Sequence, residues 1–194
     1  MTKLMSKEDI IISKLLIWYT KNKRILPWRI KKNTQKPVPY YIFVSEFMLQ
    51  QTTVNEVTTK FNYFIKKWPD LLKFSKCNES DVLKFWSGLG YYRRAINLLK
   101  SAKIISLKHK NKIPNNYSEL INLPGIGEYT AKAILGIAFN QPVFPIDANI
   151  ARIIVRLYGF NQSLNLIQKK IKKKSEFYEH KFQSSNLIQS FMDY

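Results

Sequence analysis

The stretch that decides the fold runs from residue 122 to residue 149 and reads NLPGIGEYTAKAILGIAFNQPVFPIDAN. It begins with LPGIG at 123–127, a turn whose two glycines can adopt positive φ and let another backbone approach closely. After the turn, apolar residues recur three and four positions apart, the spacing of a helix face: Ala131, Ile134, Leu135 and Ala138. Because residues 117–121 also read as helical, the stretch predicts two helices joined by a tight hairpin.

This hairpin also predicts a site for a phosphate group. A helix that begins directly after a turn presents unpaired N–H groups, which favour an anion. The stretch holds one lysine and two acidic residues, a net charge of −1, so we expect backbone geometry to hold the phosphate instead of bulk charge. A plain connection between helices is the more common role of such a turn, and the turn alone leaves that alternative open.

The chain as a whole is strongly basic. Its 194 residues include 32 Lys plus Arg against 13 Asp plus Glu, a formal net charge of +19 at pH 7. This excess favours a nucleic acid as the partner, with an anionic membrane surface second. An AT-rich genome would also enrich Lys, Ile and Asn, so part of the charge is discounted. With 45% hydrophobic residues, the chain can bury the core of one or two small domains.

The cysteine content limits the possible classes of protein. Cys77 is the only cysteine, which excludes an internal disulfide framework and a cluster of cysteine ligands within the chain. A single cysteine fits a reducing cytosol. The first 20 residues are interrupted by lysines and acidic residues and do not read as a signal peptide, and no apolar run is long enough to span a membrane.

Helical periodicity continues along most of the chain. The expected helices cover residues 7–21, 40–51 and 53–68, a short stretch capped by Ser80 and Asp81, a long stretch that reaches about residue 107, and the residues between Asp147 and Gly159. The basic run at 169–174 is also expected on a helix. A last amphipathic helix holds Phe182, Leu187 and Phe191, and we expect it to pack only against the N-terminal helix.

The most informative second motif is VSEFMLQQT at 44–52. On a helix, the neighbours of Glu46 one turn away are Ile42, Phe43, Leu49 and Gln50. A carboxyl group among apolar neighbours loses hydration, which disfavours its charged form. The motif therefore predicts that Glu46 stays protonated and acts as an acid near neutral pH. A surface glutamate on an otherwise packed helix is the alternative.

Together, SEFMLQQT, LPGIGEYTA and the following PIDAN resemble the helix-hairpin-helix base-excision DNA glycosylases, and within them the adenine glycosylase branch. The resemblance runs from about Trp18 to Asp193. It implies an all-α fold of two domains. A six-helix barrel is expected at 31–142, with the helix-hairpin-helix at 116–138, and the second helical domain is expected to combine 1–30 and 143–194.

The resemblance also implies an activity and its catalytic residues. Proteins of this kind flip adenine out of duplex DNA where it lies opposite 8-oxoguanine or guanine, and hydrolyse its N-glycosidic bond. Glu46 matches the acid that protonates the adenine ring. Asp147 matches the carboxylate that stabilises the positively charged sugar, with a covalent intermediate left open. Tyr129 and Asn149 match residues that support this pair by hydrogen bonding.

The implied DNA contacts come from four parts of the chain. Gln51 and Tyr91 match residues that enter the base stack, and Leu49 matches one near the adenine. Trp28 and Arg29 lie in the segment that lines the base pocket. An arginine–tryptophan–arginine grouping also suits a backbone or a base, although a packed tryptophan in a surface loop is an even alternative. The complete set of candidate contacts is Gln51, Tyr91, Leu49, Trp28, Arg29, Arg24, Leu123, Gly125, Gly127 and Thr130.

A second glycine turn, GLGYYRR at 88–94, carries two tyrosines and two arginines. Such a turn suits contact with the DNA backbone and wedging into the base stack. The alternative is that Tyr92 and one arginine are packing residues, and we expect at least one tyrosine in the core.

The chain departs from the family pattern at three places. Ala148 stands where a glycine is usual, and the loop at 31–39 is longer than usual. The chain stops at 194, where family members continue into a four-cysteine loop that binds a [4Fe–4S] cluster and then a domain that reads 8-oxoguanine. We therefore expect a fragment or a shortened gene product with no cofactor and no metal within this chain.

Two other functions stay open. One is a thymine glycosylase or an endonuclease III-like lyase of the same superfamily, although the lyases carry a lysine where this chain has Tyr129. The other is a catalytically weak or inactive DNA-binding fragment. The expected setting is the bacterial cytoplasm, in association with the nucleoid, where a monomer acts on double-stranded DNA with an A:8-oxoG or A:G mispair and does not bind a membrane.

Overall fold

Helices form all the regular structure in the part of the chain that the structure describes. The computed structural model describes residues 6–29, 37–161, 164–181 and 184–194. Within these ranges there are eleven helices and no strand, which confirms the all-α prediction. None of these described helices is long and apolar enough to cross a lipid bilayer. The helices are α1 (Lys7–Asn22), α2 (Pro39–Leu49), α3 (Val54–Lys67), α4 (Leu71–Ser75), α5 (Glu79–Trp86), α6 (Arg93–Lys108), α7 (Tyr117–Ile121), α8 (Glu128–Phe139), α9 (Ala148–Tyr158), α10 (Leu164–Lys181) and α11 (Ser184–Asp193).

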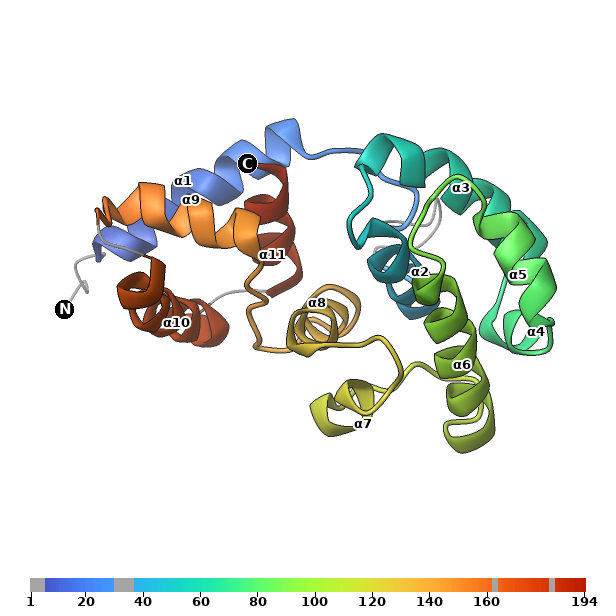
Figure 1. Ribbon diagram of the computed structural model, residues 1–194. Coiled ribbons are helices and arrows are strands. Elements are labelled where there is room, and N and C mark those ends of the chain that lie inside the picture. The colour runs from blue at the N-terminus through green and yellow to red at the C-terminus, as the bar shows by residue number, and fades with distance from the viewer. Residues whose placement is uncertain (1–5, 30–36, 162–163, 182–183) are drawn as a thin grey trace.

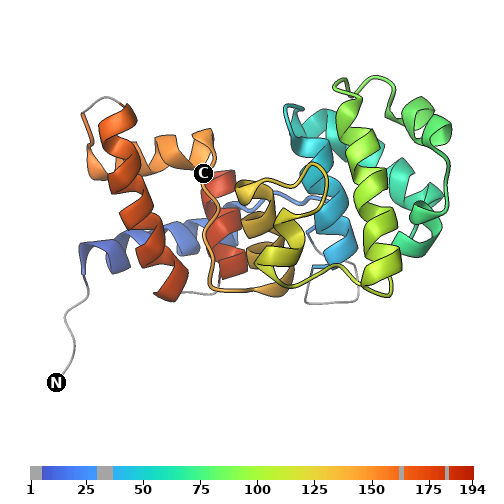
Figure 2. The same cartoon turned by 60° about the horizontal axis from the view of Figure 1, so that its bottom comes forward.

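These helices gather in two groups, with α8 between them (Figure 1). One group holds α1, α9, α10 and α11, so both ends of the chain lie in the same half of the molecule. The other group holds α2 to α6, and the short helix α7 lies beside α8. Figure 2 shows the same separation from a second angle. The domain boundaries at 31 and 142 stay a prediction, and residue 31 lies outside the described residues.

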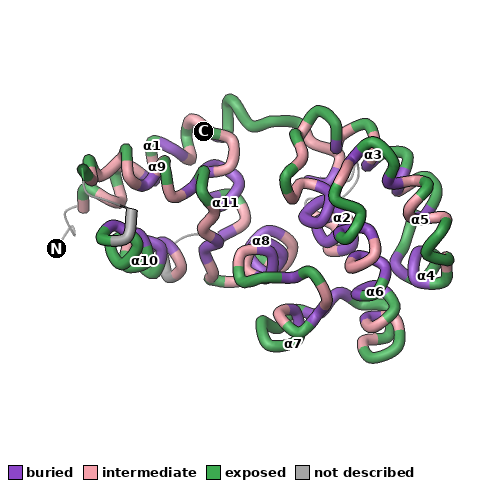
Figure 3. Tube along the Cα trace, viewed as in Figure 1, coloured by how far each residue is buried: buried purple, intermediate pink, exposed green. Residues whose placement is uncertain are grey.

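The centre of the packing is formed by α2 and α8. Within α2, residues 42–48 are all buried, and within α8, residues 130–137 are buried except Lys132. A helix that is apolar on nearly every side must be covered on every side. Accordingly, α2 packs against α3, α6 and α8, and α8 packs also against α7 and α11. Figure 3 shows buried residues along most of both helices.

Two details of the helices in the region of residues 70–86 differ from the prediction. The helix α5 begins after Asn78, whose side chain accepts a hydrogen bond from the N–H of Asp81 (2.9 Å). The predicted cap by Ser80 and Asp81 is therefore wrong. The helix α4 has no counterpart among the predicted helices, because its five residues are too few to show a helical period.

The C-terminal helix α11 packs against α8 and α9 as well as α1, so the prediction that it packs only against the N-terminal helix is wrong. Phe191 meets the ring of Phe144 edge-on, with 5.1 Å between the ring centroids. A Cβ atom on Gly136 of α8 would fall on the Cδ1 atom of Ile188, so this glycine lets α11 approach α8 closely. Phe182, predicted for the same apolar face, lies outside the described residues.

Candidate active site

A cleft of about 1150 Å³ collects most of the residues that the sequence analysis singled out. Its walls come from the segment after α1, the C-terminal end of α2, the start of α6, and parts of α8, α9 and α11. The hairpin candidates at 123, 125, 127 and 130 are not part of its lining. The ten candidates that line it are Arg24, Trp28, Arg29, Glu46, Leu49, Gln51, Tyr91, Tyr129, Asp147 and Asn149.

Glu46 is the buried acid of this cleft. Its position on α2 leaves 6% of the residue exposed. Burial of the carboxyl group, with a smaller contribution from the negative charge of Asp147, raises the pKa of Glu46 to about 8. Among the described residues, no hydrogen bond to this carboxyl group replaces the lost water. At pH 7 most of Glu46 is therefore a protonated acid, in agreement with the expectation from its apolar neighbours.

Asp147 is held at the N-terminus of α9, as a cap of that helix. Its Oδ1 atom accepts a hydrogen bond from the N–H of Ile150 (2.7 Å), and the side chain of Asn149 donates to its Oδ2 atom (3.5 Å). Arg152 in turn donates to the side-chain oxygen of Asn149 (2.8 Å), which orients the amide group of Asn149 toward Asp147. The carboxylate is thus fixed by its own helix, and the positive end of the α9 dipole favours its negative charge.

Tyr129 stands close to both carboxyl groups. It lies in the first turn of α8 and is partly buried. Burial, and then the negative charges of Glu46 and Asp147, raise the pKa of the Tyr129 phenol above its ordinary value. The phenol therefore stays neutral near pH 7 and keeps its proton as a hydrogen-bond donor in the cleft.

The hairpin presents backbone to solvent while its apolar side chains point inward. Leu123 and Thr130 are buried. Gly125 has φ +80°, and a Cβ atom there would lie 2.8 Å from side-chain atoms of Asn97 and Phe47, so this glycine serves close packing. Gly127 precedes α8 without a side-chain cap, which leaves the first N–H groups of α8 available to an anion. The roles of these four candidates in DNA binding stay predictions.

Comparison with known proteins establishes the family. Residues 44–178 match the family model described as "HhH-GPD superfamily base excision DNA repair protein". The chain belongs to the HhH-GPD superfamily. This confirms the resemblance to the helix-hairpin-helix glycosylases that the motifs carry.

The curated relatives of this HhH-GPD chain include adenine DNA glycosylases. That of Buchnera aphidicola subsp. Acyrthosiphon pisum (strain APS) is 45% identical over 166 residues, which cover 84% of this chain and 45% of the relative. That of Buchnera aphidicola subsp. Baizongia pistaciae (strain Bp) is 40% identical over 180 residues, 92% of this chain and 50% of the relative. The human adenine DNA glycosylase is 36% identical over 163 residues, which cover 81% of this chain and 30% of the relative. The chain thus spans half or less of the length of these relatives.

Solved structures share the fold over nearly the whole chain. A thermostable thymine-DNA glycosylase superposes with a TM-score of 0.83 at 26% identity, and the match covers 96% of this chain and 85% of that one. A non-covalent endonuclease III–DNA complex superposes with a TM-score of 0.73 at 18% identity, covering 97% and 85%. At 18% identity the second match shows the HhH-GPD fold alone.

A buried arginine shapes the rim of the HhH-GPD cleft, as the packing alternative for one arginine of the 88–94 turn predicts. Arg94, 7% exposed, donates from its guanidinium to Thr52 Oγ1 (2.8 Å) and to carbonyl oxygens of two segments that are distant in sequence. One segment is the C-terminal end of α2, and the other is the glycine turn before α6. The carbonyl acceptors are Phe47 (3.2 Å), Met48 (2.9 Å), Gln50, Leu89 (2.8 Å) and Gly90 (3.2 Å).

The two segments that Arg94 joins carry the residues expected to enter the base stack. Gln51 (φ 58°) and Tyr91 (φ 47°) both have left-handed backbone, which costs a non-glycine residue roughly 1 kcal/mol or more. Both side chains are exposed at the cleft. Tyr91 is 62% and Tyr92 48% exposed, so the expectation of a core tyrosine is wrong, whereas an arginine of this turn does pack inside.

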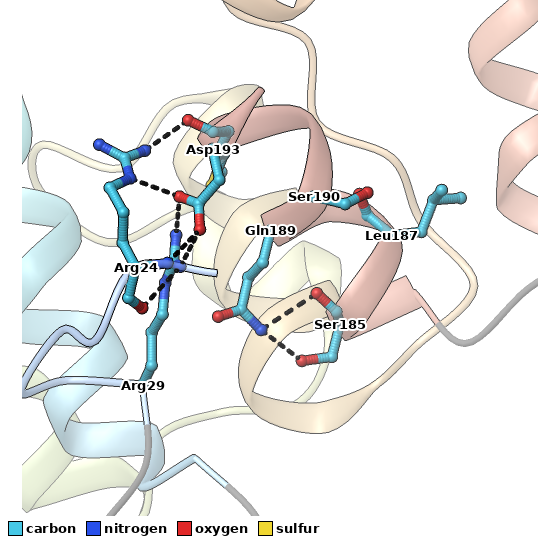
Figure 4. Close-up of polar contacts among 8 residues, drawn as sticks. Arg24, Arg29, Ser185, Leu187, Gln189, Ser190 and Asp193 are labelled. Atoms are coloured by element: carbon cyan, nitrogen blue, oxygen red, sulfur yellow. Dashed lines mark hydrogen bonds and ion pairs between the residues drawn. The ribbon is translucent and has the colours of Figure 1, made fainter. Parts of the chain in front are cut away.

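Arg24 and Arg29 are held by the C-terminal end of α11 (Figure 4). Arg29 is buried and donates to both carboxylate oxygens of Asp193 (2.6 and 2.7 Å). Arg24 donates to Asp193 through Nε (2.6 Å) and through its backbone N–H (3.0 Å). Burial opposes the charge on Asp193, but the hydrogen bonds from Arg29 and Arg24 outweigh it and hold the pKa of Asp193 below its ordinary value.

The arginines and the tryptophan of the segment before α2 make contacts within the protein. The guanidinium groups of Arg24 and Arg29 have partners within the protein, so they fix α11 against the cleft. Trp28 is buried and meets the ring of Phe61 edge-on at 5.3 Å, as the packed alternative predicts. The roles of Arg24, Trp28 and Arg29 in DNA contact stay predictions.

Gln189 of α11 is a further cleft residue that the sequence analysis missed. It is 5% exposed and lines the cleft. Its Nε2 atom donates to the backbone oxygen of Ser185 (3.1 Å) and to Ser185 Oγ (3.0 Å), as Figure 4 shows. Ser185 Oγ gives its own proton to the carbonyl of Ile137 (3.1 Å), so both partners of Gln189 are acceptors. The amide NH₂ of Gln189 therefore faces Ser185, and among the described residues no hydrogen bond to its amide oxygen is found. Gln189 lines this cleft and also a neighbouring cavity that Ser185 lines.

The residues of this chain do not fit an iron–sulfur cluster. A [4Fe–4S] cluster takes about four cysteine thiolates, and the sequence contains one cysteine, Cys77. Among the residues that the structure describes, no group of three or more His, Cys, Asp or Glu side chains could hold a metal ion.

Replacement of Arg94 tests its part in holding the cleft rim. We expect Arg94→Lys to lower the free energy of unfolding by about 2 kcal/mol or more, because lysine lacks the planar fork and leaves buried carbonyls without donors. Arg93→Lys is the matched control, since Arg93 is the exposed neighbour, and should change it by about 0.5 kcal/mol or less. Urea denaturation measures both; equal values for the two variants would contradict the role of Arg94.

Proposed function

We propose that this chain is a DNA glycosylase that hydrolyses the N-glycosidic bond of adenine in duplex DNA, where adenine lies opposite 8-oxoguanine or guanine. The observation that carries the proposal is the protonated carboxyl group of Glu46 in the same cleft as the carboxylate of Asp147. The family match and the adenine DNA glycosylases among the relatives support it. We propose further that the chain acts as a monomer.

The two carboxyl groups divide the reaction between them. Glu46 donates its proton to a ring nitrogen of adenine, so the bond from the sugar C1′ breaks with a neutral base as the leaving group. Positive charge then develops on the sugar, and the negative charge of Asp147 stabilises it. Addition of water to C1′ releases a proton and leaves an abasic site. Tyr129 supplies a neutral hydrogen-bond donor beside both groups throughout.

Hydrolysis is favoured over lyase chemistry by the lining of the cleft. A lyase needs an amine that forms a Schiff base with the sugar. Among the described residues no lysine lines the cleft, and Tyr129 provides a phenol. An endonuclease III-like activity is therefore the weaker proposal.

We propose that the amide oxygen of Gln189 faces the cleft and favours adenine as the base. Its amide oxygen can accept a hydrogen bond from the exocyclic amino group of adenine. Thymine and guanine present carbonyl oxygens, O4 and O6, at the corresponding edge. Two acceptors facing each other without a donor are unfavourable, so the cleft would discriminate against both bases. The same hydrogen bond would separate adenine from thymine, the base named for the thermostable structural relative.

The rim of the cleft suits extrusion of a base from the duplex. Removal of a base from the stack leaves a gap that side chains can fill. Gln51 and Tyr91 are exposed at this rim on two segments that Arg94 fixes together. We propose that these two side chains enter the stack while adenine occupies the cleft.

The catalytic pair is tested by Glu46→Gln and Asp147→Asn in single-turnover assays on duplex with adenine opposite 8-oxoguanine. Each variant should lose about a hundredfold or more in rate, because each removes one charge or proton from the reaction, while binding to the duplex persists. Glu176→Gln, an exposed change on α10, is the control and should cut like the parent. Parental rates for both cleft variants would refute the assignment.

The pH dependence of excision should report Glu46. The raised pKa means that the acid is protonated below about pH 8 and ionises above it. We expect the single-turnover rate, measured with enough enzyme to bind all of the DNA, to fall about tenfold per pH unit above this value. Glu46→Gln should remove that alkaline limb from whatever residual rate remains. A wild-type rate that is flat from pH 7 to pH 10 would contradict the role of Glu46 as acid.

The proposed base contact is tested by Gln189→Leu on two substrates. With adenine, the variant should be about tenfold slower, because the amino group loses its acceptor. With unsubstituted purine, which lacks the amino group, wild type and variant should differ much less. Asn186→Leu, an exposed change on the same helix, serves as the control. Equal losses on both substrates would show a structural effect of Gln189 instead of base recognition.

A further inference from the structure

A second cavity adjoins the catalytic cleft. It measures about 560 Å³ and shares Tyr129, Asp147 and Ala148 with the cleft, so the two spaces meet at Asp147. Its remaining walls come from α8, from the segment before α9, from α9 itself and from α10. We call it the side chamber, and its remaining lining residues are Glu128, Lys132, Phe144, Ile146, Ala151, Gln168, Ile171, Lys172 and Ser175.

The side chamber contains two lysines in different situations. Lys132 of α8 is engaged by Glu128 (3.2 Å) and by Glu179 (3.4 Å). Lys172 of α10 is exposed, and within the described residues no ion pair or hydrogen bond to its ammonium group is found. Lys172 is therefore a free positive charge on the chamber wall.

The position of Lys172 follows from the helical period of α10. Gln168, Ile171, Lys172 and Ser175 occur at intervals of three and four residues and so share one face. Ile171 and Ser175 are buried on this face, and Lys172 lies at its exposed edge. Lys173 is the next residue along, also exposed, but it does not line the chamber.

We propose that Lys172 binds a backbone phosphate of the strand that carries the flipped nucleotide, at one of the two phosphates flanking that nucleotide. The inference rests on the proposed function, which places the sugar against Asp147. Because Asp147 lines both spaces, a strand whose sugar faces Asp147 has the side chamber beside it, and in this proposal it leaves the cleft along that side. A free ammonium group at that exit matches the charge of a phosphate, and Lys132 partly neutralises Glu128 of α8 and Glu179 of α10.

This contact makes Lys172 a positioning residue. It touches neither the base nor the sugar, so it leaves the proton transfer from Glu46 unchanged. It would hold the extruded nucleotide with its sugar toward Asp147. Its loss should therefore appear in the binding of DNA that has an extruded nucleotide, and in the salt dependence of that binding.

The test compares Lys172→Ala with Lys173→Ala, which removes the same charge from the same helix. The probe is a duplex that carries a stable, uncleavable abasic-site analogue opposite guanine. Lys172→Ala should weaken binding about tenfold and reduce the slope of log affinity against log salt by about 0.9, the value of one phosphate contact. Lys173→Ala should have less than half of this effect on log affinity.

Neutral methylphosphonate linkages then locate the phosphate. A neutral linkage at one of the two flanking positions should give wild type and Lys172→Ala equal affinity, because the phosphate that Lys172 binds is then uncharged. A neutral linkage at the other position should leave the difference in affinity between the two proteins. Equal effects of the two alanine variants, or a difference that survives both neutral linkages, would overturn the inference. Binding to this probe needs no excision, so a wild-type protein that shows the Lys172 pattern but removes no adenine would refute the proposed function and leave the phosphate site standing.

Discussion

The burial of one carboxyl group is the constraint on which the rest of the cleft depends. The apolar residues that make α2 a central helix also remove water from Glu46. With a pKa of about 8 in the folded state, Glu46 stays protonated from about pH 4.5 to 8, where the unfolded chain ionises it. The contribution of this group to stability is therefore fully present at acid pH and is lost as the pH rises through 8. The packing of α2 against α3, α6 and α8 must offset that loss at neutral pH.

The second carboxylate comes from the other side of α8, and the fold must hold it in register with the first. Asp147 is fixed locally by the first turn of α9, whereas the neighbouring wall is fixed by distant contacts. Arg24 and Arg29 bind Asp193 at the end of α11, and Gly136 lets α11 settle closely on α8. Arg94 fixes the rim of the cleft, because it joins the end of α2 to the turn before α6. The buried Arg29 and Arg94, together with Arg24, thus help to set the shape of the cleft that holds the two carboxyl groups.

The parts of this arrangement that depend on local sequence could be predicted, and the parts that depend on distant contacts could not. The apolar neighbours of Glu46 predict its burial, and the position of Asp147 before an apolar periodic run predicts a helix cap. Nothing in the run of two arginines at 93 and 94 shows which one turns inward. The partner of Arg24 and Arg29 lies more than 160 residues away in the chain. The orientation of Gln189 likewise depends on its contact with Ser185, whose hydroxyl donates to the carbonyl group of Ile137. Only the fold brings this carbonyl group of α8 to α11.

The comparisons alone do not select the base, because one fold serves proteins named for different reactions. The thymine-DNA glycosylase superposes at a TM-score of 0.83, while the sequence relatives are adenine DNA glycosylases. A difference between bases must therefore come from a few cleft atoms and not from the helices. In this cleft the group that we propose for this role is the carboxamide of Gln189, whose NH₂ donates to two acceptors of Ser185. An amide oxygen that faces the base can accept a hydrogen bond from the amino group of adenine, but it cannot donate one to the O4 atom of thymine. In the proposed function, selectivity for the base would then depend on the contact between Gln189 and Ser185, which turns the amide NH₂ away from the base.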